Sequence, residues 1–123
     1  MEWKIEYIES EGFLYIKTWG AITSEFANTY VKETIEAANR HQCHRQIVDH
    51  REAVFAFSLA EYYERPDINR QMGLSLTWRI AMVFKELSRD TQFMEDVFRN
   101  RGYCFRQFDD MDKAKTWVLG NEP

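Results

Sequence analysis

The first part of the chain alternates between apolar and polar positions with the period of a β-strand. Trp3, Ile5 and Tyr7 are separated by charged residues, a pattern typical of a strand that buries one face. After the polar turn 9–12, which ends in glycine, β-type residues resume over 13–19. Two such runs joined by a short polar turn predict an antiparallel hairpin.

The spacing of apolar residues then changes to that of an α-helix. Phe26, Tyr30 and Val31 recur on one helical face, and Thr23 or Ser24 is placed to cap the start of this helix. The segment therefore predicts an amphipathic helix that packs against the hairpin.

A second helix is predicted from a capping box. Ser58 and Glu61 have the Ser-x-x-Glu spacing in which each side chain accepts a hydrogen bond from the other residue's backbone N–H. Pro66 is expected to break or restart this helix, because its ring clashes with the carbonyl four residues earlier. Two later helices are predicted to start at Ser88 or Asp90 and at Asp109 or Asp110.

Short strands are predicted between these helices, at 46–49, 78–84 and 103–108. The element order is therefore β-β-α-β-α-β-α-β-α, and residues 1–123 are expected to form a single domain. Strands that alternate with helices pair in parallel through right-handed crossovers. The fold class predicted is α/β, with a mixed, mostly parallel sheet of about five strands, an N-terminal hairpin and about four helices.

Composition and charge narrow the function classes. The net charge is −4 and the basic residues are scattered among acidic ones, which argues against a nucleic-acid partner. The N-terminus does not resemble a signal peptide, and no apolar run is long enough for a membrane span. Cys43 and Cys104 are therefore expected to be reduced thiols in a cytoplasmic protein.

Several segments carry a resemblance to a known family, and they are Ile47–Glu52, Arg79–Val83, Phe98–Gly102, Phe105–Asp110 and Asp112–Val118. Together with the predicted element order, they resemble the STAS-like domains related to bacterial anti-sigma-factor antagonists, in particular the SpoIIAA-like branch. The resemblance implies a SpoIIAA-like fold and a regulatory role through protein binding. It also implies a relationship to the CRAL-TRIO lipid-binding proteins, which share this fold.

One feature of that family is missing from this chain. In the antagonists, the phosphorylated serine lies in an Asp-Ser-Ser-Gly-like turn that opens the helix after the acidic-ended strand. Here an aromatic connection follows Asp49 instead, and Ser58 is the only hydroxyl near the expected helix start. Ser58 is thus a candidate phosphorylation site by resemblance, although its place in the capping box already explains it.

The sequence predicts no catalytic, metal or cofactor site. The segment 41–44, with Asp49 and His50 downstream, contains metal-ligand types in His41, Cys43 and His44, but these residues lack the paired spacing of a zinc site. Cys43 also lies close to histidines in sequence, but nothing indicates an activated thiolate beside an oriented base. Nucleophile elbows, phosphate-binding loops and dinucleotide fingerprints are absent as well. The protein is therefore not expected to be an enzyme.

The connection after Asp49 is the most informative segment. It is rich in aromatic residues and lies at the carboxyl end of a parallel sheet, where open α/β folds bind their ligands. Two interpretations stay open: these rings cover one edge of the core, or they form an exposed apolar patch with a polar rim. The candidate binding surface comprises Asp49, Arg51, Phe55, Phe57, Ser58, Tyr62 and Tyr63. Arg51 also has a structural alternative, in which it pairs with Asp49 or Glu52.

Two functions are consistent with this surface. The first is a non-catalytic interaction or regulatory module that binds a protein partner or associates with itself. The second is a binder of a small apolar ligand, such as a lipid or fatty acid. The second is weakened by length, because a chain of 123 residues uses most of its apolar side chains in its own core.

Overall fold

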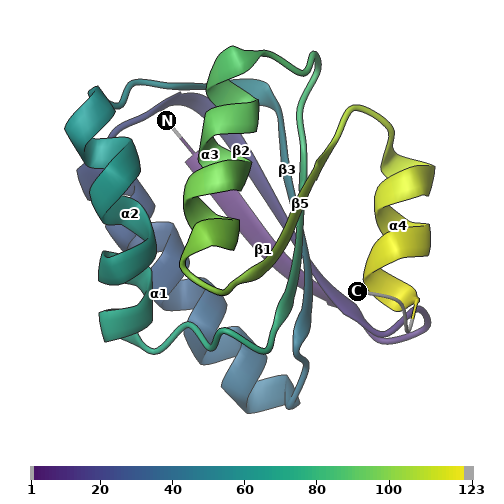
Figure 1. Cartoon of the computed structure of the whole chain (residues 1–123). Helices are drawn as coiled ribbons and strands as arrows, with labels where there is room; N and C mark the ends of the chain where they lie inside the picture. The colour runs from purple at the N-terminus through teal and green to yellow at the C-terminus, as the bar shows by residue number, and fades with distance from the viewer. Residues whose placement is uncertain (1, 121–123) are drawn as a thin grey trace.

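The predicted order of elements is confirmed by the structure, a computed structural model that describes residues 2–120 (Figure 1). The strands and helices in chain order are β1 Glu2–Ile8, β2 Phe13–Ile22, α1 Ser24–His41, β3 Arg45–Phe55, α2 Leu59–Met72, β4 Arg79–Val83, α3 Arg89–Asn100, β5 Cys104–Phe108 and α4 Met111–Leu119.

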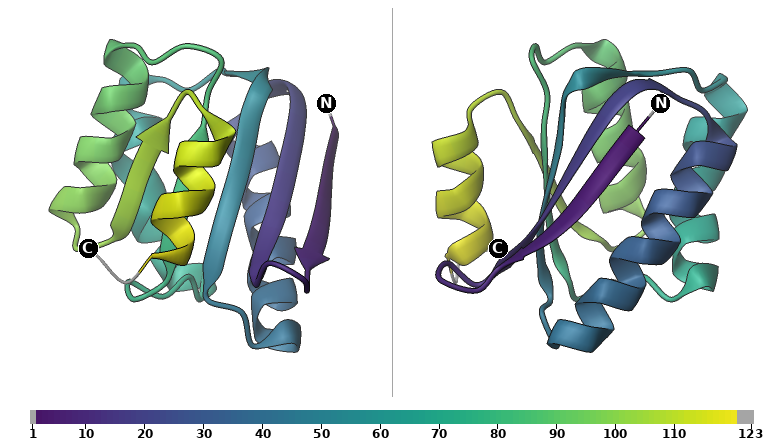
Figure 2. Two further views of the ribbon diagram at one scale, coloured as in Figure 1. Left: turned by 90° about the vertical axis from the view of Figure 1, so that its right-hand side faces the viewer. Right: turned by 180° about the vertical axis from the view of Figure 1, so that it is seen from behind.

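The strands form one mixed sheet in the order β1-β2-β3-β4-β5. β1 pairs antiparallel with β2, and the other neighbours pair in parallel. When successive crossovers have the same handedness and each leads to the next strand in the same direction, their helices lie on the same face of the sheet. Accordingly α1, α2 and α3 cover one face, whereas α4 alone packs on the other, over β3, β4 and β5 (Figure 2).

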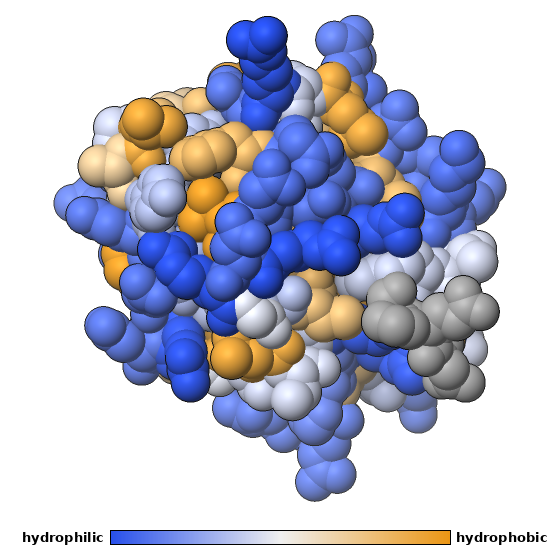
Figure 3. Space-filling view, viewed as in Figure 1, coloured by the Kyte–Doolittle hydropathy of each residue, from blue (hydrophilic) through white to orange (hydrophobic). Residues whose placement is uncertain are grey.

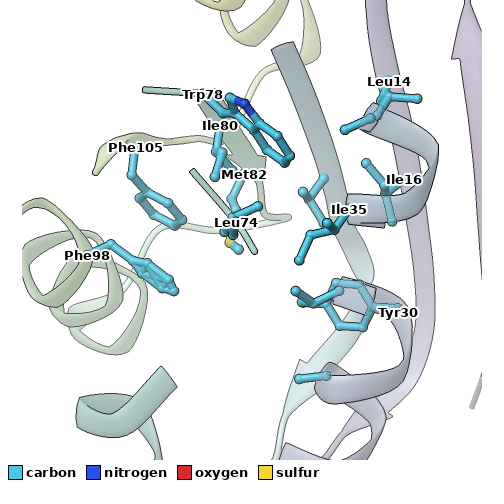
Figure 4. Close-up of a cluster of buried hydrophobic side chains, with 14 of the residues drawn as sticks. Leu14, Ile16, Tyr30, Ile35, Leu74, Trp78, Ile80, Met82, Phe98 and Phe105 are labelled. Atoms are coloured by element: carbon cyan, nitrogen blue, oxygen red, sulfur yellow. The ribbon is translucent and has the colours of Figure 1, made fainter. Parts of the chain in front are cut away.

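Each face of the sheet has its own hydrophobic cluster. The larger one fills the space between the sheet and α1–α3 (Figure 4) and includes Leu14, Ile16, Tyr30, Ile35, Ile80, Met82, Phe98 and Phe105. The smaller one lies under α4 and consists of Phe13, Ile47, Ala81, Val83, Ala114 and Val118. β4 contributes alternate residues to both clusters, which explains why its sequence is apolar without alternation.

The helix starts follow the predicted capping chemistry. Thr23 and Asp110 are the N-caps of α1 and α4, and each accepts a hydrogen bond from a backbone N–H of the first turn. Ser58 and Ser88 cap α2 and α3, and both form complete capping boxes. Helix starts can be predicted from such local signals, because an N-cap satisfies backbone donors that only a nearby side chain can reach.

Two strands are longer than predicted. β2 continues beyond residue 19 to Ile22, and β3 continues beyond Asp49 to Phe55. The two extensions pair with each other, from Trp19 opposite Glu52 to Ile22 opposite Phe55. Neither extension has a clear strand pattern in its own sequence, because each is a strand through its pairing with the other.

The predicted break at Pro66 is wrong. α2 runs through Pro66 without interruption. The ring is buried, and the hydroxyl of Tyr103 donates to the Pro66 carbonyl at 2.7 Å. Tertiary contacts on both sides of the proline therefore outweigh the lost backbone hydrogen bond.

Arg65 joins α2 to α1 through a buried guanidinium. The side chain is 5% exposed and donates to Asn69 Oδ1 at 2.8 Å, Asn28 Oδ1 at 2.6 Å and the Ser24 carbonyl at 3.2 Å. These acceptors are all neutral, and burial lowers the pKa of Arg65. The planar fork of the guanidinium reaches three acceptors at once, which an ammonium group does not do from one position.

We expect Arg65→Lys to lower the free energy of unfolding by about 2 kcal/mol, because buried amide oxygens lose their donors. Urea unfolding at neutral pH measures this change. Arg70→Lys, at an exposed position of the same helix, is the matched control and should change stability by less than about 0.5 kcal/mol. Equal stability of Arg65→Lys and the wild type would refute the bridging role.

Candidate functional site

β3 extends well past its neighbour β4. The two strands pair only from Arg45 opposite Arg79 to Asp49 opposite Val83. Beyond that point, β3 pairs only with β2, up to Phe55. Residues 50–55 of β3, called the β3 overhang below, therefore have a strand on one side and none on the other.

A β-bulge marks the start of the overhang. Lys17 lies opposite Asp49 and Trp19 lies opposite Glu52, so β3 contains one more residue than β2 between these pairs. A bulge leaves a backbone group without its ladder partner. The freed N–H is that of Arg51, which donates to Asp49 Oδ1 at 3.1 Å.

The Asp49 carboxylate is buried and fully hydrogen-bonded. Arg51 donates from Nε to Oδ1 at 3.0 Å and from Nη2 to Oδ2 at 2.9 Å, and the Tyr15 hydroxyl donates to Oδ2 at 2.6 Å. Burial alone would raise the pKa of Asp49, but the hydrogen bonds from Arg51 and Tyr15 outweigh it and hold the pKa at about 2. Burial, followed by the bond to Asp49, raises the pKa of Tyr15 to about 12. Asp49 is therefore ionised at physiological pH and acts as a structural group.

His50, the next residue, lies on the opposite face of the sheet. It is 1% exposed, and its Nδ1 lies 2.7 Å from Thr18 Oγ1. The rings of Phe55, Phe84 and Tyr30 surround it at centroid distances of 4.8, 5.7 and 6.1 Å. Burial lowers the pKa of His50 to about 3, so the ring is neutral at physiological pH. Its Nε2 has no hydrogen-bond partner.

A cavity of about 220 Å³ opens beside the overhang. It lies between β3 and the connection from β4 to α3, at the carboxyl end of the parallel strands. Its inner wall includes His50, Phe55, Tyr62, Phe84 and Met94. Charged side chains of both signs stand at its rim, and they are Arg51, Lys85, Glu86 and Asp90.

A second, smaller cavity of about 40 Å³ lies deeper, between the sheet and the helices. Phe55 and Tyr62 line both cavities, and Phe57 lines only the inner one. Ring centroids 5.2 Å apart join Phe55 to Phe57 and Phe57 to Tyr62. The predicted aromatic segment therefore forms the partition between an outer polar-rimmed cavity and an inner apolar one.

The structure separates the predicted site residues into groups. Phe55, Phe57 and Tyr62 are half-buried and pack against the larger core, as in the interpretation in which they cover the core. Asp49 instead bonds Tyr15, which packs on the cluster under α4. Arg51 pairs with Asp49, as in its structural alternative.

The other two candidates lie at the surface. Ser58 is exposed and its Oγ accepts from the Glu61 N–H at 3.2 Å. Tyr63 is 56% exposed. Both belong to the beginning of α2, next to the end of the overhang.

Most of the exposed large apolar side chains belong to segments at this end of the molecule. Among residues 2–120, four of the five exposed large apolar side chains belong to the overhang, the first two turns of α2 and the β4–α3 connection: Val54, Leu59, Tyr63 and Leu87. The fifth, Leu119, lies on α4. Figure 3 shows one group of apolar residues at the upper left, around the start of α2, and a separate group at the upper right. These four residues are called the carboxyl-end surface below.

Two findings concern other functional classes. Across residues 2–120, no three His, Cys, Asp or Glu side chains gather closely enough to hold a metal ion. None of the helices in the same part of the chain is long and apolar enough to cross a membrane.

Comparison with known proteins identifies solved structures of similar fold. No protein-family model matches the sequence, and no curated protein is significantly similar to it. Among solved structures, an uncharacterised protein of the DUF3478 family with a SpoIIAA-like fold, from Shewanella loihica PV-4, aligns over 95% of this chain and 92% of its own, with a TM-score of 0.62 and 18% identity. The chain has a SpoIIAA-like fold.

The anti-sigma factor antagonist SpoIIAA, in its unphosphorylated form, is a second similar structure. It aligns over 91% of this chain and 92% of its own, with a TM-score of 0.52 and 11% identity. The SpoIIAA-like fold predicted from the sequence is therefore confirmed. At these identities, the similarity shows the fold, and function has to be argued from the site itself.

From the sequence, His50 was considered as a metal-ligand type and as a base near Cys43, and its place in a cavity was missed. One signal was available. Gln46 and Val48 alternate with His50, so a strand that continued past Asp49 would have placed His50 on the same buried face. No such alternation marks the β4–α3 connection, which forms the far wall of the cavity.

The neutral state of His50 makes stability depend on pH. Its pKa is about 3 in the folded protein against 6.5 ordinarily, so the unfolded chain binds this proton more readily and acid favours unfolding. Between pH 7 and pH 5, we expect His50 to lower the free energy of unfolding of the wild type by about 2 kcal/mol. The decrease in His50→Phe over the same range should be smaller by about that amount.

Urea unfolding at the two pH values measures the difference, in a range above that in which Asp49 titrates. His44→Gln, at an exposed position, is the control and should keep the wild-type dependence. An unchanged pH dependence in His50→Phe would mean that His50 is not held neutral by burial.

Proposed function

We propose that this protein is a non-catalytic interaction module that docks a protein partner, or a second copy of itself, on the carboxyl-end surface. The observation that carries the proposal is the concentration of exposed apolar side chains there, with Val54 and Leu59 each 71% exposed. Apolar side chains that gather at one place on a surface mark interaction sites more often than scattered ones do.

The surroundings of this surface fit the anatomy of an interface. Arg51, Glu52, Lys85 and Glu86 are exposed around the apolar residues. Protein interfaces commonly combine an apolar centre with a polar rim. The SpoIIAA-like fold adds support by analogy, since one similar structure is that of an anti-sigma factor antagonist.

The ionisable groups at this end favour binding over catalysis. Asp49 is fully paired, and the hydroxyl nearest His50 is that of Thr18. Thr18 is 0% exposed between two strands, where a substrate would not reach it. A nucleophile with an accessible base beside it is the minimum for covalent catalysis.

A small apolar ligand such as a fatty acid is the alternative function. Its candidate location is the inner cavity, with Phe57 and Tyr62 in the lining. The volume of about 40 Å³ holds only a few water molecules, whereas ligand pockets typically measure roughly 300–1,000 Å³. Protein docking therefore explains the observed geometry better, because it needs no rearrangement of the core.

Two further features are consistent with a regulated module of the cytoplasm. Cys43 and Cys104 are both free thiols, as expected in a reducing compartment. Ser58 is exposed beside Leu59, and phosphorylation there would add negative charge at the docking surface. We propose Ser58 as a regulatory site on that ground.

The docking proposal is tested by replacing the exposed residues rather than the rings that pack on the core. We expect the double variant Leu59→Ser with Tyr63→Ser to keep its fold, because both side chains are exposed, and to bind at least about tenfold more weakly. Light scattering over a concentration series measures self-association, and affinity capture with quantitative mass spectrometry measures partner binding.

Leu119→Ser is the matched control, since it removes an exposed leucine from the far side of the molecule. It should behave as the wild type in both measurements. A double variant that binds as well as this control would contradict docking at the carboxyl-end surface.

A further inference from the structure

The outer edge of β1 is a regular strand edge with no neighbouring strand. β1 is the last strand of the sheet order and pairs only with β2, and Figure 2 shows it at the rim of the sheet. Proteins commonly protect such an edge with a bulge, a proline or a covering group. On β5, at the other end of the sheet, the buried Glu95 covers one such group. β1 pairs with β2 over all seven of its residues without a bulge, and it contains no proline.

Alternate residues of β1 direct their backbone groups away from β2. The Ile8 carbonyl accepts from the Gly12 N–H at 2.7 Å, across the turn that leads into β2, so Ile8 faces β2. Along an antiparallel ladder, successive residues face opposite sides. Trp3, Ile5 and Tyr7 therefore direct their N–H and C=O groups outward. No loop or side chain of residues 2–120 hydrogen-bonds to these groups.

Lys4 and Glu6 are two unpaired charges on this edge strand. Both are exposed, and neither forms an ion pair within the part of the chain that the structure describes. The residue opposite Lys4 on β2 is Lys17, which itself pairs with Glu52 at 3.1 Å. Like charges directly opposite each other are unfavourable in a sheet. An anion on the outer side of Lys4 would offset that repulsion.

A second copy of the same strand supplies the complementary charges. When two β1 strands pair antiparallel about a two-fold axis at Ile5, Lys4 of each lies opposite Glu6 of the other. Trp3 lies opposite Tyr7 in the same register, and all seven residues of the strand are paired. The outward-facing residues Trp3, Ile5 and Tyr7 then form the hydrogen-bonded pairs. Lys4 and Glu6 fall in the non-hydrogen-bonded pairs, where side chains come closest.

The groove beside β1 has the same antiparallel complementarity. Its volume is about 350 Å³, and its α1 side consists of Glu33, Glu36, Ala37 and Arg40. Trp3 Nε1 donates to Glu33, whereas the Tyr7 ring stacks on His41 at 4.4 Å. Acidic residues therefore lie at the Trp3 end, and Arg40 lies toward the Tyr7 end. In the antiparallel register, the acidic end of each groove faces the Arg40 end of the other.

We propose that β1 is a self-association edge, which pairs antiparallel with β1 of a second copy about a two-fold axis at Ile5. The two sheets then become one continuous sheet, with both α1 helices on the same face. This interface is separate from the carboxyl-end surface, because none of the four residues of that surface belongs to β1 or α1.

Charge reversal at the two edge positions tests the pairing. Light scattering at low ionic strength, over micromolar to millimolar concentrations, should show the wild type approaching twice the chain mass of 14.8 kDa. Lys4→Glu places glutamate opposite glutamate and Glu6→Lys places lysine opposite lysine, so each should weaken the dimer at least about tenfold. Lys113→Glu, at an exposed position of α4, makes the same charge change as Lys4→Glu and should dimerise as the wild type does.

Mixing the two edge variants tests the register. An equimolar mixture of Lys4→Glu and Glu6→Lys should form a heterodimer with about the wild-type affinity, because both cross-strand pairs are again of opposite charge. Recovery in the mixture also shows that both variants are folded. A wild type that stays monomeric throughout the series would overturn the proposal. Dimerisation unchanged by either single variant, or absence of the heterodimer, would overturn it as well.

The variant Leu59→Ser with Tyr63→Ser separates this interface from the carboxyl-end surface. It should keep the dimer that β1 forms. Loss of the dimer in that variant, with no loss in Lys4→Glu, would place self-association at the carboxyl-end surface and contradict pairing through β1. Failure of the β1 pairing leaves partner capture at the carboxyl-end surface unaffected.

Discussion

The carboxylate of Asp49 determines how β3 leaves the sheet. Its bonds to Arg51 and Tyr15 hold the bulge, and the extra residue shifts the alternation of every side chain that follows. Before the bulge, Val48 and His50 face the helices; after it, Phe55 does. Without the bulge, Phe55 would face the other side and Val54 would enter the core. The aromatic partition, the exposed valine and the outer cavity all depend on this shift.

The remainder of the chain forms a scaffold that supports the β3 overhang. Capped helices cover one face of the sheet, and α4 covers part of the other. The free edge of β5 is protected, because the buried Glu95 accepts from the Gln107 N–H at 2.7 Å. Besides the edge strands β1 and β5, the β3 overhang leaves backbone groups without a strand partner, because β4 is too short to cover it. A longer β4 would remove the outer cavity and its hydrogen-bonding groups together.

Much of the scaffold was predictable because its signals are local. Alternation gave the hairpin, and the capping box at Ser58 gave the start of α2, whereas Ser88 was one of two caps predicted for α3. The overhang was not predictable, because it exists through pairing with β2 and its bulge interrupts the alternation. Asp49 and Phe55 were both identified as site candidates, but their placement on opposite faces follows from that same bulge. Pro66 was misjudged because contacts distant in sequence stabilise the helix around it.

The edge of the β3 overhang that faces the outer cavity has no strand partner. Native-state hydrogen exchange at single amides measures this directly. The N–H groups of Ala53 and Phe55 should exchange at least about tenfold faster than that of Ala56, whose N–H donates to Ile22. Equal protection of Ala53, Phe55 and Ala56 in the free protein would mean that this edge is already paired.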